Sequence, residues 1–161
     1  MTDLITEGKG EEGLALERLA TYLFLTIPGI IVKNRRVGKG GEVDVLVGNL
    51  GGPGRPFGWF GDYFLVECKD KAEDPVSESD FGHFLTKLNL TKTKQGAIVS
   101  RWGFSGSAGK GRAYAKRDQK TAFSEMGVAV LDISVHEIEM LNKLDDWLML
   151  LQRKYEEIRF N

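Results

Sequence analysis

The sequence predicts an α/β fold in which helices flank a mixed β-sheet. Helix-like and strand-like hydrophobic patterns follow one another in the order α-β-β-β-α-β-α-β-α. Short turns or a hairpin loop join the first three strand patterns, which favours an antiparallel meander. The later strand patterns follow helical patterns, which favours parallel strands with helices on the faces of the sheet. At this length we expect a single domain over residues 1–161.

The N-terminal half contains one helix pattern and three strand patterns after a loose start at residues 1–8. Apolar residues from Leu14 to Phe24 recur at helical spacing, and Pro28 ends that helix. Runs rich in valine, leucine and aromatic residues, bounded by glycine, indicate the strands. The predicted elements are a helix at 10–26 and strands at 30–36, 42–47 and 63–69.

The C-terminal half contains two strand patterns between helices. Asp74 is predicted to cap a helix that ends near Leu90, because a proline follows it at the first helical position. Ser134 and Glu137 have the spacing of a capping box, which predicts the start of a long C-terminal helix through 134–160. The other predicted elements are strands at 96–100 and 128–133 and a helix at 107–120.

Two groups of large apolar residues lie outside the predicted core pattern. The loop at 48–61 is dense in glycine and proline and carries Phe57, Trp59 and Phe60. These rings are predicted either to stack on or wedge into DNA, or to pack at the sheet edge or a dimer contact. A second group lies off the main apolar stripe of the C-terminal helix and predicts burial against another subunit, and so a homodimer: Trp147, Met149 and Leu150.

Composition excludes several kinds of site. Cys68 is the only cysteine, which rules out a disulfide framework or a cysteine-rich zinc site within one chain. His83 and His136 lie far apart, so a bound metal would have oxygen ligands, as magnesium, manganese and calcium prefer. The net charge of −1 indicates no partner. The first residues do not form a signal-peptide pattern, and we expect a cytoplasmic protein.

Charged residues inside two apolar strand patterns point to a catalytic site. Asp44 lies within one strand, and Glu67 and Lys69 end the next, where alternation places both on the same face. Buried charges need partners, and two carboxylates together with the Cys68 carbonyl are suited to Mg²⁺ or Mn²⁺. Such a site would activate water for phosphodiester hydrolysis, with Lys69 orienting the water and stabilising the transition state. An ordinary salt bridge at a strand end is the alternative.

An Asp followed after a hairpin by Glu-x-Lys, in an α-β-β-β-α-β core, resembles the PD-(D/E)XK nuclease superfamily, although Val43 stands where that motif has proline. The resemblance implies a restriction-endonuclease-like fold with Asp44, Glu67 and Lys69 as catalytic residues. Glu17 on the first helix corresponds to a further acidic residue of that superfamily. Its alternative is an exposed helical glutamate.

The segments from Gly96 to Ser105 and from Val130 to Ile133 resemble the modified-DNA-directed (type IV) restriction endonuclease family, which implies a DNA endonuclease of the restriction type. A Holliday-junction resolvase or repair nuclease of the same fold is an alternative. A non-catalytic nucleic-acid-binding module is an alternative of another class.

The charge distribution favours a DNA partner. Between Lys87 and Lys120 the chain has nine basic residues and one acidic residue, a net charge of +8. Such an excess suits phosphate contacts, although a solvated helix face would also explain it. The residues predicted to bind DNA are Lys92, Lys94, Arg101, Lys110, Arg112 and Lys116.

Overall fold

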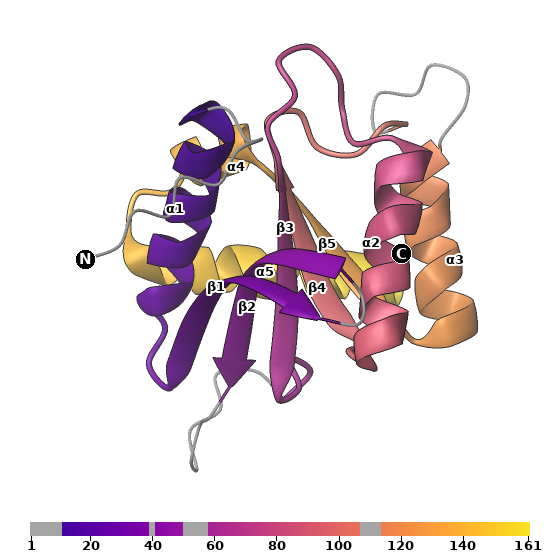
Figure 1. The fold of residues 1–161 in the computed structure, drawn as a ribbon, viewed down its shortest axis with the longest axis horizontal. Coiled ribbons are helices and arrows are strands. Elements are labelled where there is room, and N and C mark those ends of the chain that lie inside the picture. The colour runs from indigo at the N-terminus through magenta and orange to yellow at the C-terminus, as the bar shows by residue number, and fades with distance from the viewer. Residues whose placement is uncertain (1–10, 39–40, 50–57, 107–113) are drawn as a thin grey trace.

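A five-stranded mixed sheet forms the centre of the fold, with helices on both faces (Figure 1). The computed structural model describes residues 11–38, 41–49, 58–106 and 114–161. The strands are β1 (Ile30–Gly38), β2 (Gly41–Asn49), β3 (Tyr63–Lys69), β4 (Gln95–Ser100) and β5 (Ala129–Ser134). The helices are α1 (Glu11–Leu25), α2 (Glu78–Thr91), α3 (Tyr114–Met126), α4 (Val135–Glu139) and α5 (Leu144–Phe160).

The order of the strands in the sheet is their order in the chain. β1, β2 and β3 pair antiparallel, and β4 and β5 join parallel to β3. The tight connection between β1 and β2 enforces the antiparallel pair, whereas α2 and α3 return the chain to the starting edge and make the last strands parallel. The predicted α/β class, meander and parallel additions are confirmed.

The two faces of the sheet bury separate hydrophobic clusters. α1 and α5 cover one face, where Phe24, Phe64 and Trp147 are fully buried. α2 and α3 cover the other face, where Phe84 and Phe104 are buried. Figure 1 shows α1 on one side of the sheet and α2 with α3 on the other. A charged side chain on a strand therefore faces one helix pair or the other, which decides its partners.

The predicted start of α2 at Asp74 is wrong. The N-cap is Ser77, whose hydroxyl accepts a hydrogen bond from the amide of Asp80 while the Asp80 carboxylate accepts one from the amide of Ser77. Val76 forms an isolated parallel bridge with Phe104, so the chain is still extended at that position. The helix begins only after this bridge. α3 also ends later than predicted, at Met126 rather than near residue 120.

The predicted long C-terminal helix is two helices. The capping box at Ser134 and Glu137 is present and begins α4, as predicted. The chain then leaves the helix, and the carboxylate of Asp146 accepts hydrogen bonds from the amides of Asn142 and Lys143, both at 3.0 Å, at the start of α5. The five-residue helix α4 and the separate helix α5 therefore replace the predicted continuous helix.

This break turns the predicted second apolar face inward. Trp147 is fully buried and Leu150 is 4% exposed, both in the cluster beneath α1. They pack within the chain, so the predicted burial of these two side chains against another subunit is wrong, while the homodimer stays a prediction. Met149 alone of the group remains exposed, at 67%. The aromatic loop also packs: Phe60 stacks on Phe64 and Trp59 stacks on Tyr155, each at 4.3 Å between ring centroids.

Burial of Phe60 excludes the predicted wedge role for that ring and confirms packing against the sheet, while Phe57 lies outside the described residues. Trp59 is held further by a hydrogen bond from its indole nitrogen to the Gln152 side chain at 2.8 Å. His83 is exposed. No helix in the described part of the chain is both long enough and apolar enough to cross a membrane.

Candidate functional site

Asp44, Glu67 and the backbone between Glu67 and Lys69 come together where β2 meets β3. The antiparallel register pairs Val45 with Val66, which brings the start of β2 beside the end of β3. The amide of Cys68 donates a hydrogen bond to Oδ2 of Asp44 at 2.8 Å. Asp44 is 3% exposed and Glu67 is 6% exposed. The carboxylates predicted to share a site are thus both buried at one junction of the sheet.

Glu67 accepts an ammonium group on each carboxylate oxygen. Lys69 lies two residues along the same strand, and its Nζ is 2.9 Å from Oε1. The Nζ of Lys87, from α2, is 2.7 Å from Oε2. The contact with Lys69 confirms the predicted alternation of side chains. The contact with Lys87 places the Glu67 carboxylate on the face covered by α2 and α3.

Sequence reasoning placed Lys87 only in the basic segment and not in the site. A signal for its position was present, because Phe84 and Leu88 mark the buried stripe of α2 and Lys87 lies three residues after Phe84, on the same side of the helix. A lysine on that stripe must find a carboxylate or reach solvent. Which carboxylate it meets depends on the packing of α2 against β3, which the sequence pattern does not specify.

Glu17 is buried, at 5% exposure, which excludes the alternative of an exposed helical glutamate. It belongs to α1, which covers the face opposite to α2, whereas the carboxylate of Glu67 faces Lys87 on α2. The two glutamates approach the sheet from different sides. A catalytic role for Glu17 remains a prediction. Glu42, at the start of β2, is exposed.

A second buried carboxylate, Asp132, lies on the same face of the sheet and was not predicted. The parallel registers pair Glu67 with Ile98 and Ile98 with Asp132, so the two acids occupy one row across three strands. Oδ2 of Asp132 forms an ion pair with Nζ of Lys116 at 2.9 Å, and Oδ1 accepts a hydrogen bond from the Phe104 amide at 3.1 Å. The signal used for Asp44, an acid inside an apolar strand, applies to Asp132 as well.

The chemistry of the donor set fits a hard divalent cation. The carboxylates of Asp44 and Glu67 and the carbonyl of Cys68 are oxygen ligands of the kind that Mg²⁺ takes. Within the described ranges no group of three or more histidine, cysteine, aspartate or glutamate side chains is arranged to hold a metal ion. Two protein carboxylates are nonetheless a usual number for Mg²⁺, which keeps several waters. The lysines on Glu67 are the groups that a cation would meet there.

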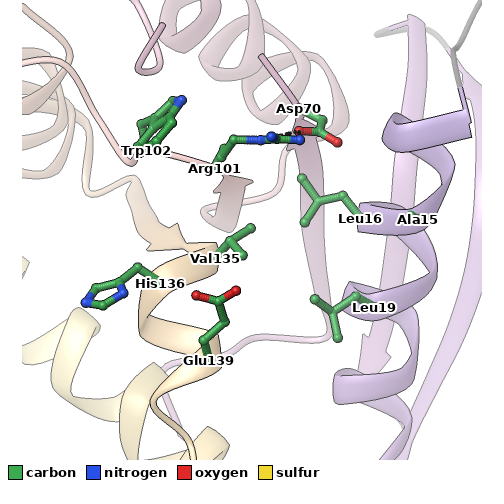
Figure 2. A pocket seen from close by; sticks show the side chains of 9 residues that line it. All are labelled: Ala15, Leu16, Leu19, Asp70, Arg101, Trp102, Val135, His136 and Glu139. Carbon is green, nitrogen blue, oxygen red and sulfur yellow. Dashed lines mark hydrogen bonds and ion pairs between the residues drawn. The ribbon is translucent and has the colours of Figure 1, made fainter. Parts of the chain in front are cut away.

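A hollow of about 640 Å³ opens at the carboxyl ends of the parallel strands, next to the site. Figure 2 shows its walls, formed by Leu16 and Leu19 of α1 on one side and by His136 and Glu139 of α4 on the other. Arg101 lies against Asp70, with Nη2 2.8 Å from Oδ1. Asp70 directly follows Lys69, so the hollow adjoins the site, although its α1 wall lies on the opposite face of the sheet.

The predicted DNA-binding residues do not form one patch. Lys94 precedes β4 and Arg101 follows it, so they lie at opposite ends of a strand of six residues, about 20 Å long. Lys92 is the left-handed C-cap of α2, at the same end as Lys94. Lys116 lies at the other end, with its amine on Asp132. The two remaining residues are outside the described part of the chain: Lys110 and Arg112.

Two carboxylates near this edge have shifted pKa values. Burial opposes ionisation of Asp80, but hydrogen bonds from Lys71 and from the amide and hydroxyl of Ser77 outweigh it and lower its pKa to about 2. Burial also opposes ionisation of Glu137, while Lys154 and the Ser134 amide lower its pKa below the usual range. Both carboxylates therefore stay ionised at neutral pH and hold the starts of α2 and α4.

Comparisons with known protein families, with curated proteins and with solved structures find no match to this chain. The arrangement of its own residues is therefore the basis for assigning a function.

Proposed function

We propose that this protein is a metal-dependent endonuclease that hydrolyses phosphodiester bonds in DNA, on a restriction-endonuclease-like fold. One observation carries the proposal: an Asp within β2 and the Glu-x-Lys at the end of β3 are buried at the same junction of the sheet, with the Cys68 amide bonded to Asp44. Burying two carboxylates is costly unless they serve a ligand or pair with cations. The order of helices and strands supports the same reading.

Each residue of the junction has a role in this proposal. Asp44 and Glu67 would hold Mg²⁺, or Mn²⁺ in its place, together with the carbonyl of Cys68. A bound Mg²⁺ polarises a phosphate and lowers the pKa of a coordinated water. The hydrogen bond from the Cys68 amide fixes Asp44 before any ligand arrives, which reduces the reorganisation that binding requires.

Lys69 is the residue best placed to face the substrate. Its side chain is 27% exposed while its amine contacts Glu67, so it connects the buried carboxylate to solvent. In the proposed reaction its ammonium group orients the attacking water and stabilises charge that develops on the phosphate. The carboxyl ends of β3 and β4 would then face DNA, since Lys69 ends β3 and Arg101 follows β4.

The test is nicking of supercoiled plasmid by the purified protein with Mg²⁺ or Mn²⁺. We expect nicking that EDTA abolishes and that Asp44→Asn reduces at least roughly a hundredfold, as loss of a catalytic group typically does. Asp74→Asn is the matched control, because Asp74 is an exposed carboxylate in the loop before α2. Nicking that survives EDTA, or full activity of Asp44→Asn, would contradict the proposal.

The kind of DNA that the protein cuts would distinguish a restriction endonuclease from a repair nuclease. A restriction enzyme of the modified-DNA type would cut methylated plasmid in preference to unmethylated plasmid. A junction resolvase would cut a synthetic four-way junction in preference to linear duplex. Cleavage of both strands requires two active sites, so we propose a homodimer in either case, tested by light scattering. The contact would involve surfaces other than Trp147 and Leu150, which are buried.

A second candidate function is a DNA-binding module without catalysis. The observation that favours it is the pairing of Glu67 with two lysines, which already neutralises that carboxylate. Under this reading the cluster is a structural ion-pair network. A protein that retards DNA in a gel but cuts no plasmid, junction or methylated substrate with either metal would support this second candidate and exclude the first.

A further inference from the structure

Lys87 is tied to the candidate site from a different layer of the fold than the other site residues. Its side chain is 19% exposed, less than the 27% of Lys69, and its amine makes the shorter contact to Glu67, 2.7 Å against 2.9 Å. Asp44, Glu67 and Lys69 come from strands, whereas Lys87 reaches down from α2. A four-carbon side chain from a helix can withdraw without moving the sheet.

Because it is positively charged, the Lys87 ammonium group competes with any metal cation for the Glu67 carboxylate. The ammonium groups of Lys69 and Lys87 occupy both oxygens of the carboxylate. A divalent cation that binds Glu67 needs one of those oxygens and repels the ammonium group that remains nearby. The repulsion acts in a buried setting, where solvent screens it weakly. This repulsion favours withdrawal of one lysine when the cation binds.

We propose that Lys87 is a resident counter-ion of Glu67, which a divalent cation displaces from Oε2, so that Lys87 sets how weakly the metal binds. This inference rests on the proposed metal site. In the metal-free protein Lys87 removes the cost of a buried carboxylate. With metal bound, its amine withdraws toward solvent while Lys69 stays beside Glu67 for the reaction.

The chain offers a matched control for this role. Lys116 on α3 makes an equivalent contact, 2.9 Å from the buried carboxylate of Asp132, on the same face of the sheet. Its side chain is 28% exposed, and Asp132 is 5% exposed. A change at Lys116 removes one positive charge from the same region without touching Glu67. It separates direct competition at Glu67 from a general change of the electrostatic field.

The experiment measures Mn²⁺ affinity of the purified full-length chain by electron paramagnetic resonance, without DNA. Lys87→Met keeps most of the length of the side chain and removes its charge. Lys87→Gln also removes the charge but keeps a hydrogen-bond donor. We expect both variants to bind Mn²⁺ roughly tenfold or more tightly than the parent, because the Lys87 ammonium group that repels the metal ion has been removed. Lys87→Arg keeps the charge and should stay within about threefold of the parent. Lys116→Met should also stay within that range.

Thermal unfolding with and without Mn²⁺ gives a second readout. Lys87→Met should lose stability in EDTA, and Mn²⁺ should raise its Tm by more than it raises that of the parent. Equal Mn²⁺ affinity in the parent and in Lys87→Gln would overturn the role of Lys87 and leave the nuclease proposal standing. Weaker binding in Lys87→Gln, or an equal gain in Lys116→Met, would overturn it too. No Mn²⁺ binding by any variant would remove the metal site, and both proposals with it.

Discussion

Glu67 and Asp132 occupy the same row of the sheet and each meets a lysine from the helix above, yet their remaining hydrogen bonds differ. Asp132 divides its oxygens between Lys116 and the backbone amide of Phe104. Glu67 gives both of its oxygens to lysine side chains. A backbone donor cannot leave without a change in the fold, whereas an ammonium group on a flexible side chain can.

Within the proposed function, the difference distinguishes Asp132, which is bound to the loop after β4, from Glu67, whose side-chain donors could make way for a metal ion. Asp132 holds the loop after β4, where Gly103 has a left-handed φ of +77° and its amide donates to the Ser100 hydroxyl. Its Oδ1 accepts the hydrogen bond from the Phe104 amide that keeps that loop in place. Glu67 holds no loop, and its partners are cations that a metal ion can replace. We therefore expect two buried carboxylates on the same face of the sheet, Glu67 and Asp132, to differ in function according to their donors.

The largest expected effect is on catalysis. Glu67→Gln should reduce plasmid nicking by about a hundredfold to ten-thousandfold, because a carboxylate ligand and its charge are lost. Asp132→Asn keeps the shape of the side chain and should change nicking by less than about threefold, since it lies outside the site. Single-turnover nicking rates with saturating Mn²⁺ measure both. Equal losses in the two variants would show that Asp132 belongs to the site.

The next effect is on the free energy of unfolding, where we expect a change at Asp132 to cost more than a change at Glu67. Asp132→Ala removes the acceptor of the hydrogen bond from the Phe104 amide and the carboxylate that pairs with the Lys116 ammonium, and we expect the free energy of unfolding to fall by about 3 kcal/mol. Glu67→Gln keeps an acceptor oxygen for one of the two lysines, and the other lysine can turn to solvent because both side chains are partly exposed, so the change should cost about 1 kcal/mol. Urea unfolding followed by circular dichroism measures both. A larger loss in Glu67→Gln would contradict the structural role given to Asp132.

A smaller effect tests whether Asp132 acts through the loop. An added Cβ at Gly103 would stand 3.2 Å from Oδ1 of Asp132, and its φ of +77° disfavours any other residue. Gly103→Ala should therefore cost about 1–2 kcal/mol, largely from the left-handed backbone. In Asp132→Ala the same change should cost less, because the oxygen is gone. A double-mutant cycle in urea gives the coupling, and strict additivity would show that the loop and the carboxylate are independent.

The sequence predicted this site better where its signals are local. β3 was placed correctly because its apolar run is bounded by glycine and by charge, and alternation then put Glu67 and Lys69 on one face. The start of α2 was misplaced because Asp74 and the proline after it have the local pattern of a helix start, whereas the bridge from Val76 to Phe104, distant in sequence, keeps the chain extended up to Ser77. The part played by Lys87 depends on helix packing and was missed for the same reason.

The smallest effect concerns a third carboxylate, Asp80, which combines a lysine with backbone and hydroxyl donors, as Asp132 combines a lysine with an amide. Its pKa in the folded protein is about 2, below the ordinary 3.8. A lowered pKa means that the ionised group stabilises the fold above about pH 4, and that this stability is lost as pH falls toward 2. Because the pair with Lys71 is partly solvated, we expect about 1 kcal/mol.

Asp80→Asn should therefore lower the free energy of unfolding by about 1 kcal/mol at pH 7 and by almost nothing at pH 2. Asp74→Asn, a few residues earlier and exposed, serves as the control and should show no such dependence on pH. Urea unfolding between pH 2 and 7 measures the difference between each variant and the parent. A difference that persists at pH 2 would mean that hydrogen bonding, and not charge, gives Asp80 its effect. Carboxylates with backbone donors would then stabilise the fold independently of their ionisation, which would extend to Asp132 and set Glu67 further apart.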